Sequence, residues 1–505
     1  MKLFSKIFTL LAIVSIVTAC HPKKPVEMPE VLVPGPNQVV LGITANNELV
    51  RFNANTPSTT ISKNAITGLV AGEKLLSIDY RPATGELYAL SDASKIYIIN
   101  TTTFASRVVS ATPFTPAVSG SIVQIDFNPT VDRIRLVSNN GQNIRLNPET
   151  GAVVATDAAI NGVIAAAVQG IAYTNNRSGA ATTVLYDIDV TSGKLYRQDP
   201  PNNGTLAEVG SLGVTFTGAA AFDISPDNSA ALVATKVGNN NSLFTIDVNT
   251  GKLSKIGNLN DVLLDIAIPT DPVAYGVDAA NALQIFNPTS ATPSLTSKAI
   301  TGLQVGENIL GIDFRPANGQ LYALGSSNRL YTLNTSSGVA TMVGTAAFST
   351  PLIGADFGMD FNPTVDRIRV VSNTGQNVRL NPIDGTFVAN DAMLNPGIPM
   401  VTATAYTNNF AGATTTRMLN IDANTDRLAE QSPPNNGTQV DIGPLGIDIT
   451  SANGFDIGSS SGVAYLAATV GGASRLYTVN LTSGSCTAVG TLSSSLKAFT
   501  IGLGF

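Results

Sequence analysis

Seven aspartates recur at one position of a repeated short segment, each between two apolar residues, as in SIDY, QIDF and GMDF. If these segments line a common channel, the carboxylates converge near one mouth and could hold a hard cation such as Ca2+ through oxygen ligands. The alternative role is structural, because each carboxylate could accept hydrogen bonds from the turn that follows it. Repetition in nearly every segment favours the structural role. The seven are Asp79, Asp126, Asp223, Asp265, Asp313, Asp360 and Asp456.

The ten residues DFNPTVDRIR occur twice, at positions 126–135 and 360–369. In the first occurrence, the period of a strand places Arg133 and Arg135 on one face, and Arg145 follows on the next strand across an Asn-Gly turn. Exposed, these guanidinium groups could bind an anionic glycan or a lipid head group. We expect them instead to form ion pairs with the adjacent aspartate or with a neighbouring module.

Two long polar loops depart most from the repeated pattern, AYTNNRSGAATT and AYTNNFAGATTT. Their tyrosines could offer a ring face to a sugar, and their asparagines could offer amides. The alternative is that the Asn residues serve the turns themselves. The candidate glycan contacts are Tyr173, Asn175, Asn176, Tyr406, Asn408 and Asn409.

Several enzyme classes conflict with the composition. The only histidine is His21, so Ser-His-Asp machinery and His-ligated zinc sites are excluded. No P-loop or dinucleotide fingerprint is present, and no basic run points to nucleic acid. Two-carboxylate glycoside chemistry stays open, although Glu is scarce and Trp is absent. We therefore predict no catalytic residues and no required cofactor, with Ca2+ as the one cation to consider.

The elements that position these residues come from an internal duplication. LLSIDYRPATGELYALSDASKIYIIN matches ILGIDFRPANGQLYALGSSNRLYTLN, and SNNGQNIRLNPETG matches SNTGQNVRLNPIDG. The chain is thus predicted to hold two tandem copies, residues 38–270 (copy 1) and 271–505 (copy 2).

Each copy repeats four short apolar segments separated by turn residues, at about 47 residues per module. Helical periodicity is missing after the N-terminal segment, and alternating β-branched and aromatic residues predict an all-β fold. Four-stranded modules at this spacing are typical of β-propeller blades.

The final segment, LKAFTIGLGF, resembles the first strand of a module with nothing after it, and the N-terminal module lacks its first strand. We therefore expect the C-terminal strand to complete the N-terminal blade. Two arrangements fit the modules. Two tandem five-bladed rings, with LLDIAI closing the first, agree with the usual four to eight blades. A single ten-bladed ring agrees with the short joint at 269–272. We favour two rings.

These motifs resemble a bacterial family known only as domain of unknown function 4394. The resemblance rests on GIDFRPANGQLYAL, DFNPTVDRIRVVSNTGQNVRLNP, AYTNNFAGATTT and PPNNGT, and it covers both copies. It implies a unit that can close by itself, but no activity, catalytic residue or cofactor.

The N-terminus reads as a lipoprotein signal. Residues 1–19 carry Lys2 and Lys6 before an apolar run too short to span a bilayer, and VTAC resembles a lipobox. We predict lipidation at Cys20, followed by a Pro-rich tether over 20–37. Asp after the lipidated cysteine is the usual signal for retention in the inner membrane. Since residue 21 is His, we expect the protein in the cell envelope, anchored in the outer membrane.

Together these observations predict a lipid-anchored extracytoplasmic β-propeller that acts as a non-enzymatic binding or interaction scaffold. Its expected partners are the membrane, through the anchor, and a glycan or an envelope protein. The alternative is a glycan-acting hydrolase or lyase that uses carboxylates at the channel mouth. A third reading is a purely architectural envelope protein.

Overall fold

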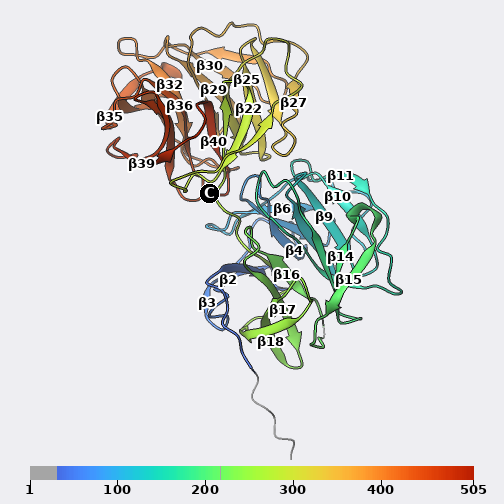
Figure 1. Cartoon of the computed structure of the whole chain (residues 1–505). Coiled ribbons are helices and arrows are strands. Elements are labelled where there is room, and N and C mark those ends of the chain that lie inside the picture. The colour runs from blue at the N-terminus through green and yellow to red at the C-terminus, as the bar shows by residue number, and fades with distance from the viewer. Residues whose placement is uncertain (1–30, 217) are drawn as a thin grey trace, which may run out of the picture.

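The computed structural model describes residues 31–216 and 218–505, and β-strands form nearly all of its regular structure (Figure 1). The predicted signal peptide, Cys20 and the start of the tether lie outside the described residues. The described helical segments are two short 3-10 turns, η1 (Pro201–Asn203) and η2 (Pro434–Asn436). Among the residues that the structure describes, we find no helix with the length and apolar character needed to cross a membrane.

Copy 1 supplies five four-stranded antiparallel sheets within the described residues. Its strands are β1 (Val39–Ile43), β2 (Glu48–Asn53), β3 (Thr60–Ala65), β4 (Leu75–Tyr80), β5 (Leu87–Ser91), β6 (Ile96–Ile99), β7 (Ser106–Val108), β8 (Val123–Asn128), β9 (Arg133–Ser138), β10 (Asn143–Leu146), β11 (Val153–Thr156), β12 (Val168–Tyr173), β13 (Leu185–Asp189), β14 (Lys194–Gln198), β15 (Leu206–Ser211), β16 (Ala221–Ile224), β17 (Ala231–Val237), β18 (Asn240–Ile246), β19 (Leu253–Asn258) and β20 (Asp265–Ala267).

Copy 2 supplies five more sheets of the same kind. Its strands are β21 (Ala274–Asp278), β22 (Ala282–Phe286), β23 (Thr296–Ala299), β24 (Ile309–Arg315), β25 (Gln320–Gly325), β26 (Arg329–Leu333), β27 (Ala340–Val343), β28 (Phe357–Asn362), β29 (Arg367–Ser372), β30 (Asn377–Leu380), β31 (Phe387–Asn390), β32 (Val401–Tyr406), β33 (Met418–Asp422), β34 (Arg427–Gln431), β35 (Gln439–Pro444), β36 (Ser451–Ile457), β37 (Ala464–Val470), β38 (Ala473–Val479), β39 (Cys486–Thr491) and β40 (Leu496–Ile501).

The last strand of each copy joins the first sheet of the same copy. In copy 1, β20 pairs antiparallel with β1 and places Ala267 opposite Leu41. In copy 2, β40 pairs with β21 and places Thr500 opposite Tyr275. The expectation that the C-terminal strand completes the N-terminal sheet was therefore wrong, because β20 already fills that place.

The first strand of each sheet lies innermost and contacts its counterpart in the next sheet. These contacts run β4–β8–β12–β16–β20 and back to β4, and likewise β24–β28–β32–β36–β40 and back to β24. Apolar side chains fill the space between neighbouring sheets. Tyr88 packs edge-on against Phe127 with ring centroids 5.1 Å apart, and Tyr322 packs against Phe361 at 5.2 Å. The fold is all-β with a repeated, propeller-like architecture, as the sequence predicted.

The two copies touch at the turns that follow β4 and β24. In the turn RPATG, Gly85 has φ +73°, and its amide donates to the carbonyl of Arg81 at 2.8 Å. The Arg81 guanidinium donates across the joint to the carbonyl of Gly319, in the matching RPANG turn, at 2.9 Å. The amide of Gly504 donates to the carbonyl of Thr84 at 2.7 Å, so the C-terminus also lies against copy 1.

Candidate functional site

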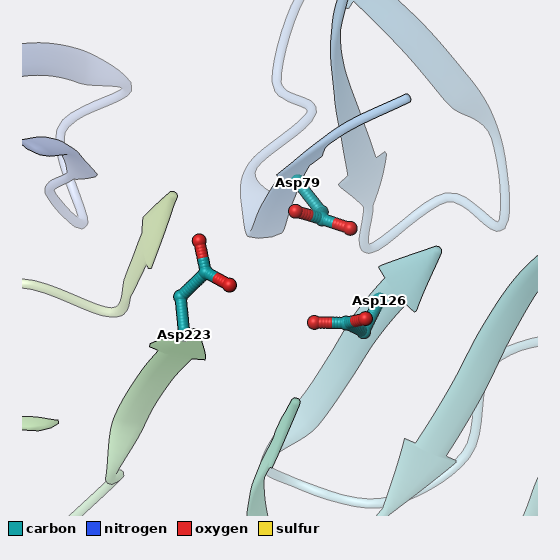
Figure 2. A group of neighbouring side chains, drawn as sticks. All are labelled: Asp79, Asp126 and Asp223. Carbon is teal, nitrogen blue, oxygen red and sulfur yellow. The ribbon is translucent and has the colours of Figure 1, made fainter. Parts of the chain in front are cut away.

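Six of the seven predicted aspartates gather in two clusters on the innermost strands. In each cluster, carboxylate oxygens of three residues all lie within 4.8 Å of one another. Figure 2 shows Asp79, Asp126 and Asp223 directed toward one another from β4, β8 and β16. The copy 2 cluster holds Asp313, Asp360 and Asp456. Carboxylates from three sheets therefore converge in each copy, as the cation hypothesis required.

Each clustered carboxylate binds the backbone of the next sheet. Asp79 accepts a hydrogen bond from the amide of Phe127 at 2.7 Å, and Asp126 accepts one from Tyr173 at 3.1 Å. Asp313, Asp360 and Asp456 do the same with Phe361, Tyr406 and Ile501, at 2.7, 3.1 and 2.7 Å. We call these contacts inter-sheet clamps. The structural role considered from the sequence had each carboxylate accept hydrogen bonds from the turn that follows it. The clamps instead join the innermost strands of two neighbouring sheets.

The clusters lie in a medium that favours protonated carboxyls. All six side chains are 1–2% exposed. Burial, followed by repulsion from Asp223, raises the pKa of Asp79, and burial followed by repulsion from Asp456 raises the pKa of Asp313. Burial raises the pKa of Asp223 to about 7 and that of Asp456 to about 6. A hard cation prefers ionised oxygens, so metal binding at either cluster would have to displace protons.

Asp265 lies outside the clamp register. Since Leu41 faces Ala267 and Tyr275 faces Thr500, the residue equivalent to Thr500 is Ala267, two positions after Asp265. From its place one pleat earlier, Asp265 accepts hydrogen bonds from the Ser77 hydroxyl and from the amide of Ile78 at 3.0 Å. It thereby joins the closing strand β20 to β4.

In copy 2 a hydroxyl takes over that joint. The Thr500 hydroxyl oxygen lies within hydrogen-bond distance of Asp313 and Asp456, at 2.9 and 2.7 Å, and its single proton can be donated to one of them at a time. It links β40 to both flanking clamps.

The predicted glycan contacts divide into buried rings and loop-serving amides. Tyr173 and Tyr406 are fully buried, so neither ring presents a face to solvent. Asn175 donates to the carbonyl of Thr182, and Asn408 to that of Thr415, both at 2.9 Å within their own loops. The remaining pair, Asn176 and Asn409, is buried, and both Asn176 amide atoms lack partners among the described residues.

Two of the three predicted arginines form ion pairs, with an acid other than the adjacent Asp132. Arg135 pairs with Asp157 at 2.5 Å, and Arg145 makes two hydrogen bonds to the same carboxylate at 2.8 and 2.9 Å. Arg133 donates instead to the carbonyl of Asp132. Asp157 was not among the residues predicted from the sequence. The signal was present, because VATD and VAND align between the copies.

In copy 2 the equivalent arginines line a cavity of about 250 Å3. We call this cavity, with its lining residues, the arginine pocket. Three guanidinium groups border it, together with Tyr406 and Asn435. The two motifs that the copies share most closely, DFNPTVDRIR and PPNNGT, thus meet at one place between neighbouring sheets.

Solved structures that are similar to the chain include two extracellular domains of bacterial proteins. The extracellular domain of a one-component system of B. thetaiotaomicron is 11% identical, with 91% of this chain and 67% of that chain covered and a TM-score of 0.25. The extracellular domain of a hybrid two-component system of the same organism is also 11% identical, with 90% and 57% covered and a TM-score of 0.27. This chain therefore spans a little over half of the second domain. TM-scores this low support no argument about function.

No curated protein matches the chain. A family model, in contrast, matches both copies, over residues 48–267 and 282–502. The matched regions hold the clamps, the arginines and the polar loops described above. The chain belongs to the family described as Domain of unknown function (DUF4394), with two tandem copies of its domain.

Proposed function

We propose that the protein is a lipid-anchored, extracytoplasmic binding scaffold made of two five-bladed β-propellers, one per copy. Support for two rings comes from the pairing of β20 with β1 and of β40 with β21. Each pairing would close a ring inside its own copy and remove the open sheet edges. The order of contacts between innermost strands, which returns to its start within each copy, agrees with this arrangement.

The anchor and the location rest on the N-terminal sequence. Residues 1–19 as signal peptide, Cys20 as the lipidated residue and 20–37 as tether would hold the propellers away from the outer membrane. The matched experiment replaces Cys20 with Ala and follows the chain through membrane fractionation. We expect the wild type in the outer-membrane fraction and the variant outside it. Equal fractionation of both chains would refute the lipid anchor.

The observation that supports a non-enzymatic role is the use of the clustered carboxylates as inter-sheet clamps. A glycoside hydrolase needs two carboxyl groups open to the substrate, about 5–9 Å apart. The clustered aspartates are instead buried and bonded to backbone amides. Burial also raises the pKa of the Cys486 thiol to about 12, which keeps it un-ionised and a poor nucleophile. The alternative, a glycan-acting hydrolase or lyase, therefore stands second.

A thermal-shift screen of the full chain tests the binding function. The probes are a panel of neutral and acidic oligosaccharides and CaCl2, each with and without added chelator. We expect at least one glycan to raise the melting temperature without being cleaved. Release of shorter sugars would favour the hydrolase or lyase. A melting temperature that no probe changes would favour a purely architectural envelope protein.

A further inference from the structure

We propose that the arginine pocket of copy 2 binds an acidic sugar, one that carries a carboxylate or a phosphate group. This inference rests on the proposed binding function and deepens it by naming the ligand class. The pocket lies within copy 2 alone, between the sheets that begin at β28 and β32, and its cavity measures about 250 Å3.

The arginine pocket carries a net positive charge. Arg367, Arg369 and Arg379 line the pocket, and the carboxylate that pairs with them, Asp391, binds only two. Arg379 makes two hydrogen bonds to Asp391, at 2.8 and 2.9 Å, and Arg369 donates to one of the same oxygens. Three positive groups against one negative group leave a formal charge of +2, which an oxyanion would neutralise.

Arg367 is the arginine at the pocket that has no ion-pair partner among the described residues. Its guanidinium donates to the carbonyl of Asp366 at 2.8 Å, and it forms no ion pair within the described part of the chain. The neighbouring Asp366 carboxylate is already engaged by Arg315 at 2.8 and 2.5 Å. Planar guanidinium groups match carboxylate and phosphate oxygens in a two-bond geometry. Arg367 is therefore the group with donors left for a ligand.

The Arg369 guanidinium at the pocket is held rigidly by its neighbours. Arg369 is 2% exposed, and its donors are fixed by the Tyr406 hydroxyl at 3.3 Å, Asn377 at 2.8 Å and Asn435 at 2.7 Å. Arg369 therefore forms a rigid wall of the pocket beside Arg367, so less of the site has to be ordered when a ligand binds.

The rim of the pocket combines exposed apolar surface with a side-chain amide. Val365 is 56% exposed, and Pro433 and Asn435 are also exposed at the edge of the pocket. Apolar surface suits the C–H face of a sugar ring, and a side-chain amide suits its hydroxyl groups. The cavity is slightly smaller than the roughly 300–1,000 Å3 of usual small-molecule sites, so it fits one sugar unit of a longer chain.

In copy 1 the residues equivalent to the arginine pocket carry a lower formal charge. The repeat places Glu149 where copy 2 has Ile383, and Glu149 accepts from Arg81 at 3.0 Å. Arg81, Arg133, Arg135 and Arg145 then face Asp132, Asp157 and Glu149, which leaves a formal charge of +1. In copy 2 the corresponding four arginines face two aspartates, which leaves +2.

Isothermal titration of the full chain in detergent tests the inference. The probes are a tetramer of galacturonic acid, glucose 6-phosphate, inorganic phosphate and a neutral tetramer of galactose. We expect the two acidic sugars to bind, with affinity that falls as salt rises, and the neutral tetramer not to bind. Arg367→Gln should weaken binding about tenfold or more. Arg475→Gln, an equal charge change at an exposed site on β38, should leave it unchanged.

Three outcomes would overturn the inference: neither acidic sugar binds, both variants have the same effect, or inorganic phosphate binds as tightly as the acidic sugars. Its failure differs from failure of the binding function. A neutral glycan that binds equally to wild type and Arg367→Gln would refute the acidic-sugar pocket and keep the scaffold. If no probe binds, both the acidic-sugar pocket and the glycan-binding function would be refuted. Ile383→Glu, which copies the copy 1 charge, should weaken acidic-sugar binding by less than Arg367→Gln.

Discussion

The fourth sheets of the two copies bury polar side chains at the same place but provide for them differently. In copy 2, Asn420 donates to Gln431 at 2.8 Å and to Gln439 at 2.9 Å, and it accepts from Thr404. In copy 1 the matching residue is Asp187, which is fully buried, and neither of its oxygens has a partner among the described residues.

The substitutions around these two residues explain the difference. Opposite Asp187 lies Ile171, and opposite Gln198 lies Leu206, whereas copy 2 has Thr404 and Gln439 at those positions. Two hydrogen-bonding partners were thus exchanged for apolar side chains. Burial raises the pKa of Asp187 to about 8. Gln198 Oε1, the counterpart of the Gln431 oxygen that accepts from Asn420, also has no partner among the described residues. Burial thus favours the protonated, neutral form of Asp187 in copy 1, whereas copy 2 carries the neutral amide of Asn420 at the same position.

The largest expected effect comes from exchanging these two residues. The Asp187 pKa rises from 3.8 to about 8 on folding, so its contribution to stability is complete below pH 4 and is lost as pH rises toward 8. The loss amounts to about 4 kcal/mol at pH 7. Asp187→Asn should raise stability at pH 8 and flatten its pH dependence, and Asn420→Asp should do the reverse. Urea unfolding at pH 5 and pH 8 measures both.

The comparison fails if Asp187→Asn and wild type lose equal stability between pH 5 and pH 8. The other buried aspartates contribute a similar trend, because burial also raises the pKa of Asp223 to about 7. For that reason the informative quantity is the difference between the two chains at each pH, and Asn420→Gln serves as the control that changes size without charge.

A second, smaller contrast separates the closing strands. Asp265→Ala would leave the Ser77 hydroxyl and the amide of Ile78 without their buried acceptor, at a cost of about 2–3 kcal/mol. Thr500→Val removes a hydroxyl but leaves the amide bonds of Asp313 and Asp456 in place, at a cost of about 1 kcal/mol. Urea unfolding at pH 5 measures the two changes. A greater loss for Thr500→Val would show that copy 2 depends more on its closing strand.

Much of this architecture could be predicted from the repeat, but not the partners of its polar groups. The alternation and turn residues fixed strands and modules, and the recurring Asp predicted convergence. The clamp partners, such as the amide of Phe127, belong to the next sheet, whose position follows from how sheets stack. Asp157 was missed because only the adjacent aspartate or a neighbouring module was considered as a partner for the arginines, whereas Asp157 directly follows β11 in the same sheet as Arg145. The C-terminal strand was misassigned since LLDIAI and LKAFTIGLGF fit either first sheet by pattern alone.

The smallest expected effect concerns an ion pair that both copies keep. Lys194 contacts Glu208 at 2.7 Å, and at the matching position Arg427 contacts Asp441 at 2.5 Å. All four side chains are more than one-third exposed, so water and salt screen both pairs. Lys194→Ala and Arg427→Ala should each leave the urea midpoint unchanged within error, at low and at high salt. This ion pair and the Asp187–Asn420 pair both occupy matching positions of the two copies. If only one of the two substitutions clearly lowers stability, then burial would not decide which differences between the copies affect stability. If neither substitution changes the urea midpoint, the differences in stability between the two copies would come from their buried polar groups.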